Sequence, residues 1–552
     1  FSSNFYFHYS GQQYGAESGL LKPFLHTWSL SVEEQFYILF PIVLLITFKY
    51  FRKYLIHILI LGFVISLGLA DWGSRNHPSF NFYVLPTRGW ELLAGSILAY
   101  FEINNGHRSK NRILNLILPF IGLILIGHSI LFFNDEMFHP SFYTLSPIIG
   151  VCLIIWFSNK DELITKILST KLFVGIGLIS YSLYLWHYPI FAYSRIIEFI
   201  QGSSLNVLLL GIVILALSIF SYYFIERPAR NKNNKFKVVL SLVSILIFTL
   251  VVINFNIIKN NGYKNRLPGI LTSALSESPR SLLEQKNQTC LDLIGCKFNI
   301  TANKKIFLIG DSHANSLSFD LKNKIVEKKF QFILYTMGGC LYFPEFNLTN
   351  NKTSKVKREC DYNYFQKLKQ TLLNEKNSII IFVGRFPLYL TNNYFDNLEG
   401  GVEGKEWGDK YVSVGKYENI QSSFKNEISE LSNNHKIILI YPIPEVGWDP
   451  YNKIYNQWVK QNLPKNFNLI NVTTSYEVYK DRAKSSFELL DNIQSSNIYR
   501  VYPHKLFCDT IVKDRCVIHD DKNVFYDDDD HPSIKGAEMI NDLIMKEIEK
   551  IE

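Results

Sequence analysis

The sequence predicts a multi-pass α-helical membrane domain of about eight helices, followed by an α/β domain of the doubly wound, flavodoxin-like type. The first observation is that the apolar residues, 47% of the 552, are concentrated before residue 258. Several apolar segments there approach the roughly 20 residues that a helix needs to cross a bilayer. After residue 304, short apolar runs alternate with polar, helix-compatible stretches, as in parallel sheets with crossover helices. We therefore expect a membrane domain over 1–257, a linker over 258–304 and an α/β domain over 305–552.

Apolar segments and their connections predict the membrane topology. The segments cover 34–50, 54–70, 88–103, 113–133, 144–158, 172–195, 204–226 and 238–257. The connections at 49–53, 107–112, 160–171 and 227–237 are rich in Lys and Arg, and the intervening ones are poorer in them. By the positive-inside rule the basic connections are cytoplasmic. Eight crossings from a start outside the cell then leave residues 258–552 outside the cytoplasmic membrane. The lipids of this membrane are the first expected partner.

The net charge and the first residue of the chain also bear on its function. The formal net charge of +8 does not indicate a nucleic-acid partner, because the basic residues lie in short runs between apolar segments. The chain begins with Phe1 rather than Met, so we expect further membrane segments ahead of it.

Polar residues inside or beside the membrane segments are costly, so each one is a functional candidate. Eight such residues are His26, Glu33, Glu34, Arg88, Glu91, His187, Glu226 and Arg227. The alternative is an interfacial aromatic belt with ion pairs that fix the helix ends. Aromatic residues of the outer connections, such as Trp72 and Trp90, are candidates for stacking on sugar rings.

Four motifs around these residues closely resemble the membrane acyltransferase 3 family. They are His26-Thr-Trp-Ser-Leu-Ser-Val-Glu-Glu-Gln-Phe-Tyr37, Thr87-Arg-Gly-Trp-Glu-Leu-Leu-Ala-Gly95, Ser180-Tyr-Ser-Leu-Tyr-Leu-Trp-His-Tyr-Pro189 and Phe224-Ile-Glu-Arg-Pro-Ala-Arg230. The resemblance covers about residues 1–230. It implies O-acylation, most often O-acetylation, of bacterial surface glycans such as lipopolysaccharide O-antigen, at the inner membrane. It also implies a cytosolic acyl donor such as acetyl-coenzyme A, with no bound cofactor.

One departure from the family concerns its catalytic residues. The family's presumed catalytic histidine and an arginine-rich motif lie in helices that precede the point where this chain starts. No residue of this sequence takes those roles, and we expect the chain alone to lack transferase activity.

The second half of the chain contains five apolar runs that we expect to form strands. They are Lys305–Ile309, Phe330–Met337, Ser378–Val383, Lys436–Pro442 and Phe467–Val472. Sites of doubly wound sheets lie at the carboxyl ends of the strands, and Ser312 follows its strand directly. A helix from about Ala314 would direct backbone N–H groups towards an oxyanion.

The motifs Gly310-Asp-Ser-His313 and Asp528-Asp-Asp-His531 suggest a catalytic triad. A serine hydroxyl needs a histidine to accept its proton, and that histidine needs a carboxylate to fix its tautomer. The domain resembles the SGNH hydrolase family, which implies Ser312 as nucleophile, His531 as base and Asp528 as orienting carboxylate. The aspartate assignment is open by a residue or so within the run 527–530.

The resemblance also implies an oxyanion hole made by the serine N–H, a glycine and an asparagine. Gly338 or Gly339 fits the glycine. The block expected to hold the asparagine instead reads Phe382-Val-Gly-Arg385-Phe386, so Arg385 is a candidate cationic substitute. His313 is expected to be a structural hydrogen-bonding residue rather than a second base.

Six of the seven cysteines lie in the second half, in near-neighbour pairs that indicate disulfides and an oxidising compartment. The pairing 290–296, 340–360 and 508–516 is favoured among 15 connectivities; the alternative is free thiols in a cytosolic domain. These cysteines are Cys290, Cys296, Cys340, Cys360, Cys508 and Cys516. No C-x-x-C motif occurs and we predict no metal site, although the run 527–530 also suits calcium or a solvated charge run.

The preferred function is therefore transfer of an acyl group, in the first place acetyl, from a cytosolic donor to a hydroxyl of a surface glycan, through an acyl-serine in the outer domain. An extracytoplasmic carbohydrate esterase would use the same triad. A third hypothesis is a non-catalytic transporter or sensor whose outer domain only binds a ligand.

Overall fold

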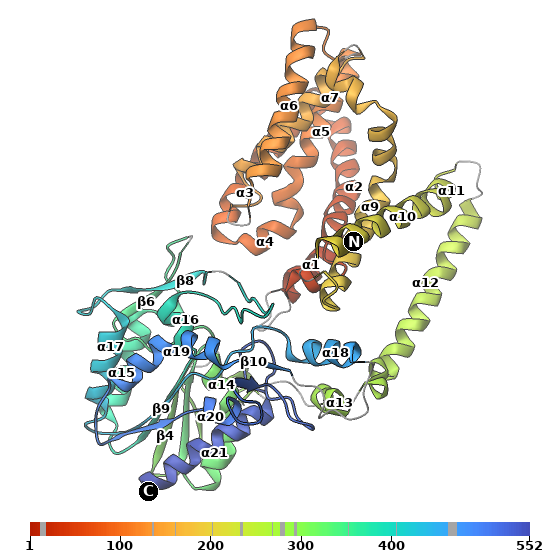
Figure 1. Cartoon of the computed structure of the whole chain (residues 1–552). Helices are drawn as coiled ribbons and strands as arrows, with labels where there is room; N and C mark the ends of the chain where they lie inside the picture. The colour runs from red at the N-terminus through yellow and green to blue at the C-terminus, as the bar shows by residue number, and fades with distance from the viewer. Residues whose placement is uncertain are drawn as a thin grey trace. The chain divides into compact units, whose positions relative to one another are not determined.

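A computed structural model of the chain describes residues 1–11, 18–106, 108–134, 137–160, 162–200, 203–231, 236–267, 269–276, 282–291, 295–351, 353–404, 406–461 and 472–552. The chain divides into two compact units, Phe1–Thr249 and Leu250–Glu552 (Figure 1). The division falls within one long helix, α12 (Phe236–Lys259).

The first unit is helical, and each of the eight predicted segments is a helix. Besides α12, these helices are α2 (Thr27–Tyr50), α3 (Leu55–Asn76), α5 (Leu85–Asn105), α6 (Arg112–Phe132), α7 (Leu145–Phe157), α9 (Lys171–Ile196) and α10 (Ser204–Ser221). Among the described residues, 5 helical stretches are long and apolar enough to cross a membrane. α5 and α9 contain more polar residues, and α7 has only 13 residues. The chain is a multi-pass membrane protein.

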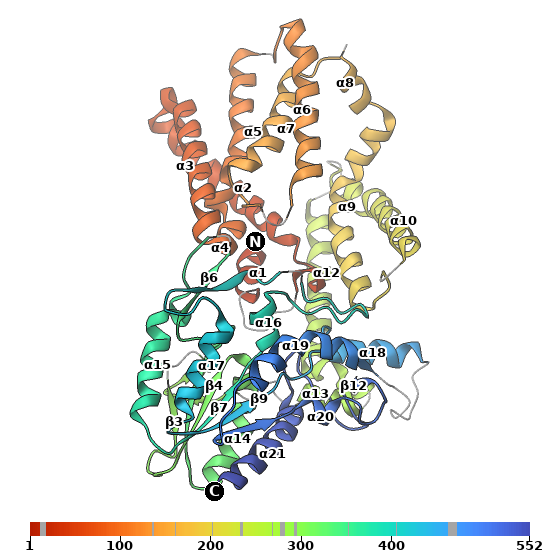
Figure 2. The same ribbon diagram turned by 60° about the vertical axis from the view of Figure 1, so that its left-hand side comes forward.

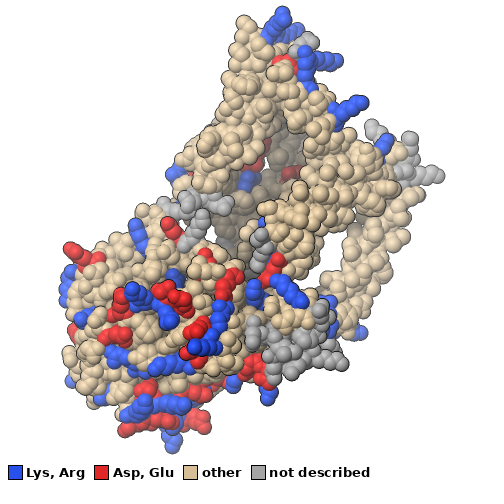
Figure 3. All heavy atoms as spheres, viewed as in Figure 1, with Lys and Arg blue, Asp and Glu red and all other residues tan. Residues whose placement is uncertain are grey.

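The surface of the helical unit is apolar, as expected for a lipid-facing surface. Leu45, Ile130 and Phe248 are 71%, 76% and 69% exposed. Exposing such side chains to water costs about 25 cal/mol per Å², so a bilayer is the environment that this surface suits. The visible face of the unit in Figure 3 is almost free of charge along the helices, with cationic side chains gathered near helix ends.

Helix packing corrects one prediction about sugar stacking. Trp90 is fully buried, with its ring packed against Phe63 at a centroid distance of 5.8 Å, so it is not available to a glycan. Its place on α5 puts it on the face that contacts α3, which the sequence did not reveal. Trp72 is 57% exposed and remains available.

The second unit is built on a six-stranded sheet with the strand order β11–β9–β7–β4–β5–β3. The strands are β3 (Cys296–Phe298), β4 (Lys305–Gly310), β5 (Gln331–Thr336), β7 (Ile379–Val383), β9 (Lys436–Ile440) and β11 (Ile498–Val501). All neighbouring pairs are parallel except β3 with β5. Four of the five predicted strands are confirmed. The fifth, Phe467–Val472, lies outside the described residues except for Val472.

Hydrophobic clusters lie on both faces of the sheet, as a doubly wound fold requires. On β4, Ile306 and Leu308 belong to the cluster that includes helices α14 (Ser312–Glu327) and α21 (Ile534–Ile551). Phe307 and Ile309 point to the opposite cluster, with α15 (Tyr362–Asn374) and α17 (Ile420–Leu431). Figures 1 and 2 show these two helix pairs on opposite faces. Because both faces are covered, β4 is apolar from Ile306 to Ile309, and the polar motif with Ser312 follows at its carboxyl end.

Three disulfides join neighbouring segments of the second unit. They connect Cys290 with Cys296, Cys340 with Cys360 and Cys508 with Cys516, the pairing that the sequence favoured. Cys152, in the helical unit, is a free thiol.

Candidate active site

Ser312 is placed by a tight junction between strand β4 and helix α14. A Cβ atom added to Gly310 would lie 1.8 Å from the carbonyl oxygen of Val383, so only glycine fits where β4 meets β7. The next residue, Asp311, caps the helix by accepting a hydrogen bond from the N–H of His313 at 2.9 Å. The helix therefore begins at Ser312, two residues earlier than predicted, and Ser312 lies at its N-terminus.

The carboxylate of Asp311 fixes this junction to the end of the neighbouring strand. It is fully buried and accepts two further hydrogen bonds at Oδ2. One comes from the backbone N–H of Arg385 at 2.8 Å and the other from the hydroxyl of Tyr389 at 2.9 Å. The sheet end is thus held by a buried carboxylate whose hydrogen bonds are satisfied, which keeps Ser312 in a defined position.

His531 reaches Ser312 from the far end of the sequence. It lies in a turn before α21, in which the N–H of Asp527 donates to the carbonyl of His531 at 2.9 Å. Nε2 of His531 is 2.7 Å from Oγ of Ser312, although 219 residues separate them. This is hydrogen-bonding distance for a base that accepts the proton of the hydroxyl.

Two carboxylates, rather than one, contact the other nitrogen of His531. Nδ1 lies 2.9 and 3.0 Å from the two oxygens of Asp528, and 2.6 Å from Oδ1 of Asp530. Asp528 also accepts from the N–H of His531 at 2.8 Å, so it holds the turn as well as the ring. The structure brings Ser312, His531 and Asp528 together and adds Asp530, which we had not singled out.

Asp530 is a buried carboxylate surrounded by cationic and imidazole groups. Its Oδ2 lies 3.1 Å from Nη1 of Arg385 and 3.0 Å from Nε2 of His313. Burial alone would raise its pKa, but Arg385, and after it His531 and His313, hold the pKa of Asp530 well below its usual range. Asp530 therefore keeps its negative charge next to His531. The signal in the sequence was the acidic run 527–530, in which we expected one orienting carboxylate and not two carboxylates beside the same imidazole.

Arg385 corrects the prediction for the oxyanion hole. Its side chain is 8% exposed, and its donors face three carboxylates, those of Glu403, Glu445 and Asp530. Nε donates to Glu445 at 2.5 Å, and the two terminal nitrogens bind Glu403 at 2.9 and 2.5 Å. No donor of the guanidinium is left for an oxyanion. Glu445 also binds Arg482 at 2.8 Å, so Arg385 belongs to a buried ionic network beneath the triad.

Oxyanion donors are better supplied by the backbone. Gly338 and Gly339 follow β5, whose last residue Thr336 pairs with Gly310, so this turn and Ser312 share one edge of the sheet. Gly339 has φ +65°, a conformation that favours glycine. Among the described residues, the N–H groups of this glycine pair make no hydrogen bond and the pair is half-buried. With the N–H of Ser312, they are the donors that suit an oxyanion.

His313 does not compete with His531 as a base. Its ring is 1% exposed, it lies 5.1 Å from the His531 ring between centroids, and its Nε2 faces Asp530. It acts on the triad only through Asp530. The oxygens of Asp528, Asp529 and Asp530 lie within 4.8 Å of one another, but Arg385 and the two histidines already contact Asp530. We assign no metal to this cluster.

Asp529 differs from its neighbour because burial and nearby carboxylates outweigh the effect of Arg385 on it. Burial, and then the charge of Asp530, raise the pKa of Asp529 from 3.8 to about 7. In the unfolded chain this carboxyl titrates near 3.9. The protonated form therefore stabilises the fold at low pH, and this contribution is lost as pH rises through about 7.

Replacing Asp529 with asparagine should accordingly stabilise the protein at pH 8 and have little effect below pH 4. Thermal unfolding of both proteins across this pH range would measure the difference in stability. Each kcal/mol of unfolding free energy shifts the Tm by roughly 2–4 °C. A constant difference at all pH values would contradict the raised pKa. Asp542→Asn is a suitable control, because Asp542 is 64% exposed and pairs with Lys324.

The candidate residues of the helical unit fall into separate groups. His26 is buried, with its ring 5.1, 5.5 and 5.3 Å from those of Tyr184, His187 and Tyr188. Arg88 forms an ion pair with Glu91 at 3.0 Å and lies over the ring of Trp28 at 5.0 Å. This second group is an ion pair at the start of α5, as the alternative interpretation proposed.

The other candidates have further contacts within the unit. Glu33 and Glu34 are on the first two turns of α2, and Nδ1 of His187 is 2.7 Å from the carbonyl of Tyr184. Glu226 contacts Arg230 at 2.8 Å rather than Arg227, and the latter lies 5.9 Å from the centre of the Tyr223 ring. The structure therefore brings His26 and His187 together, but not the eight residues as one site.

Comparison with known families matches both units. The profile described as an acyltransferase domain matches residues 2–227. The profile described as an SGNH domain fused to AT3 domains matches residues 283–546.

Curated relatives include two proteins named as acetyltransferases. The peptidoglycan O-acetyltransferase OatA of Listeria monocytogenes is 33% identical over 252 residues, 43% of this chain and 40% of the relative. The O-acetyltransferase OatA of Staphylococcus aureus is 32% identical over 227 residues, 39% of this chain and 37% of the relative. The chain thus spans about two fifths of the length of the curated relatives it matches.

A solved structure is also similar, that of the periplasmic domain of a lipopolysaccharide acetyltransferase from Salmonella ser. Paratyphi A. The match has a TM-score of 0.31 and 18% sequence identity, and it covers 45% of this chain and 87% of that one.

Proposed function

Because this chain joins an acyltransferase domain to an SGNH domain of the kind fused to AT3 domains, we propose that it is an O-acetyltransferase of a bacterial surface polysaccharide. The distance of 2.7 Å between Ser312 Oγ and His531 Nε2 is the observation that carries the chemistry. The names of the relatives, acetyltransferases of peptidoglycan among them, support acetyl as the group transferred.

In the proposed reaction, His531 accepts the proton of Ser312 as the hydroxyl attacks the acyl carbonyl. The oxyanion that forms accepts hydrogen bonds from the N–H of Ser312 and from the turn at Gly338 and Gly339. Collapse of this intermediate expels the donor group, which takes the proton from His531, and leaves an acyl-serine. A glycan hydroxyl then loses its proton to the neutral His531 as it attacks the acyl-serine, and His531 returns that proton to the displaced serine oxygen, which restores the enzyme.

Two carboxylates would support this cycle in different ways. Asp528, as hydrogen-bond acceptor for Nδ1, would hold the imidazole with its lone pair towards Ser312. Asp530, kept ionised by Arg385, would stabilise the imidazolium that forms when the proton arrives. The charge of His531 appears and disappears in each half-reaction, so a fixed anion beside it acts twice per cycle.

We also propose that the second unit is extracytoplasmic. Its three disulfides suit an oxidising compartment, and the basic connections of the helical unit suit the cytoplasmic side. The donor would then be cytosolic, acetyl-coenzyme A in the first place, and the acceptor would be a glycan outside the membrane, such as lipopolysaccharide O-antigen. Trp72 is an exposed aromatic ring suited to stacking on a sugar.

Mass analysis of envelope glycans from cells with and without the gene tests this proposal. In cells without the gene, we expect one class of glycan to lose the mass that an acetyl group adds, about 42 Da. Lipopolysaccharide and peptidoglycan would be analysed separately, because the relatives act on more than one polymer by name. Unchanged acetylation of both would contradict the proposed function. An increase in acetylation when the gene is removed would instead favour the esterase.

A further inference from the structure

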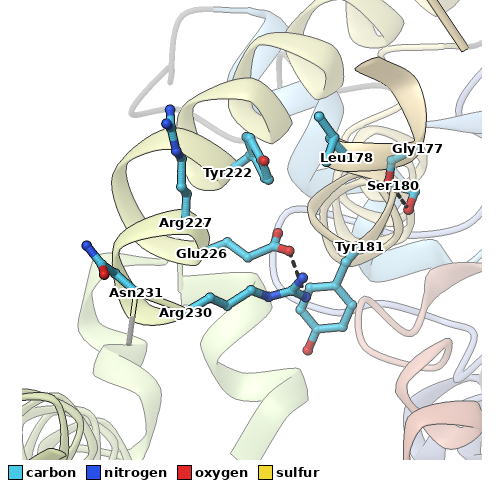
Figure 4. A pocket seen from close by; sticks show the side chains of 9 residues that line it. All are labelled: Gly177, Leu178, Ser180, Tyr181, Tyr222, Glu226, Arg227, Arg230 and Asn231. Atoms are coloured by element: carbon cyan, nitrogen blue, oxygen red, sulfur yellow. Dashed lines mark hydrogen bonds and ion pairs between the residues drawn. The ribbon is translucent and has the colours of Figure 1, made fainter. Parts of the chain in front are cut away.

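A cavity of about 480 Å³ lies in the helical unit, far along the chain from the serine. It opens between α9 and the helical segment that follows α10 (Figure 4). Its lining residues are Gly177, Leu178, Ser180, Tyr181, Tyr222, Glu226, Arg227, Arg230 and Asn231. The volume falls within the range of small-molecule sites.

A local change of helix type gives this cavity its charged wall. After α10 the chain forms a π-helical turn, η4 (Tyr222–Glu226), before the short helix α11 (Arg227–Ala229). Pro228 has no N–H, so an α-helical hydrogen bond would be lost here in any case, and a π-turn accommodates the break. In Figure 4 this turn directs the side chain of Glu226 towards α9.

Glu226 is fixed in that position by partners on both sides. One oxygen accepts a hydrogen bond from Ser182 Oγ at 2.9 Å, and the other lies 2.8 Å from Nη2 of Arg230. The carboxylate is 11% exposed, whereas Arg230 is 70% exposed. Glu226 therefore orients a guanidinium whose remaining donors face solvent and the cavity.

The charge of the lining favours an anion. Glu226 is the one acidic residue of the nine described lining residues, and Arg227 and Arg230 are both cationic. Arg227 lies over the ring of Tyr223, and no carboxylate partner is seen for it in the described part of the chain. One positive charge thus remains uncompensated, and guanidinium groups suit the geometry of phosphate oxygens.

The cavity lies at the cytoplasmic ends of its helices. Lys171, the first residue of α9, and the segment 227–237 belong to two of the basic connections, which the positive-inside rule places in the cytosol. A ligand would therefore enter from the side where a nucleotide-linked acyl donor is available.

We propose that this cavity binds phosphate groups of the acyl donor through Arg227 and Arg230, which extend in different directions (Figure 4), with Glu226 positioning Arg230. The inference rests on the proposed function, because it assigns the donor of that reaction to a place in the helical unit. Tyr181 and Tyr222 would pack against the organic part of the donor. An anionic lipid headgroup carries the same phosphate chemistry, so the experiment must separate the two sources.

Binding of coenzyme A to the full chain tests the assignment without requiring turnover. The protein would carry Ser312→Ala and be placed in phosphatidylcholine nanodiscs, with binding measured by calorimetry. We expect saturable binding, weakened about tenfold or more by Arg227→Gln, since one charge-assisted contact is lost. Arg112→Gln is the matched control, because Arg112 lies in another basic connection and outside the cavity; it should bind as the parent protein does.

A double-mutant cycle tests the role of Glu226. Arg230→Gln should weaken coenzyme A binding more than Arg227→Gln, because it also leaves the Glu226 charge unpaired beside the phosphate. Adding Glu226→Gln to Arg230→Gln should then restore part of the affinity. If all three substitutions lowered thermal stability but left binding unchanged, the residues would only fix the helix end and the proposal would be overturned.

The lipid arm uses nanodiscs that contain phosphatidylglycerol. Retained coenzyme A binding there supports the donor assignment. Arginine-dependent uptake of phosphatidylglycerol, with no saturable coenzyme A binding in either lipid, would overturn it. Failure of the proposed function has a different signature, because coenzyme A binding could persist while glycan acetylation did not depend on Ser312.

Discussion

Replacing Ser312 with alanine should abolish formation of the acyl-serine and lower the release of acetate from an acetyl ester on the order of 10⁴-fold or more. The reason is that the Ser312 hydroxyl lies 2.7 Å from His531 Nε2, which can accept its proton. Without it no acyl-serine forms, and the oxyanion donors retain only a weak effect on direct reaction with water. Release of acetate from a soluble acetyl ester, together with intact-mass detection of the acylated protein, would measure both losses in the full chain.

Ser316→Ala provides a matched control for this substitution. Ser316 lies one turn further along α14, and its hydroxyl donates to the carbonyl of Ser312 at 3.0 Å, away from His531. Its removal deletes the same atom from the same helix and should leave the ester cleavage within a few-fold of the parent. Full glycan acetylation in cells expressing Ser312→Ala would contradict the acyl-serine and would favour the binding-only interpretation of the outer unit.

Much of the fold was accessible from the sequence because its signals are local. Apolar length predicted the eight helices, and the apolar runs after residue 304 predicted four strands of the sheet. Edge strands β3 and β11 were missed because Cys296-Lys-Phe and Ile498-Tyr-Arg-Val are short and partly polar. A strand at the edge of a sheet can expose such residues, so its apolar pattern is weak.

The site was accessible only in part, since its groups are combined by the fold. The spacing of Asp528 and His531 within one turn is local, and it pointed to Asp528. The contact between Asp530 and Arg385 is different, because 145 positions separate the two residues in the sequence. It forms only because the fold brings the end of β7 next to the turn before α21. The same contact explains why Arg385 is not an oxyanion donor, because a buried guanidinium facing three carboxylates has no donors to spare.

Asparagine at position 530 should change the pH dependence of catalysis, whereas asparagine at 528 should mainly lower its rate. Asp528 accepts hydrogen bonds from Nδ1 and from the N–H of His531, so Asp528→Asn disturbs the tautomer. The expected loss in kcat is on the order of 10³–10⁴-fold. Asp530 lies 2.6 Å from Nδ1 as a fixed anion, and its removal takes away a charge that favours imidazolium.

The direction of the pH effect follows from that charge. His531 accepts a proton only when it is neutral, so activity rises with pH through the pKa of its imidazole. Loss of a neighbouring anion destabilises the imidazolium, and the acid limb of the kcat/KM profile of Asp530→Asn should therefore move to lower pH. Asp530→Asn should also lower kcat at the optimum, because the imidazolium of the transition state loses the same stabilisation.

Because of the ionic network, Asp530→Asn should lower the folding stability less than replacement of Arg385, the cationic partner of Asp530. Without the charge of Asp530, Arg385 and Arg482 still face Glu403 and Glu445, so two cations are matched by two anions. Arg385→Gln would instead leave Asp530 and Glu445 buried with less compensation, at a cost of roughly 3–5 kcal/mol of folding stability. The contrary result would be an Asp530→Asn protein that folds and shows the same acid limb of the kcat/KM profile as the parent. That result would show that Asp530 shapes the turn without an electrostatic effect on His531. Asp528 alone would then stabilise the imidazolium.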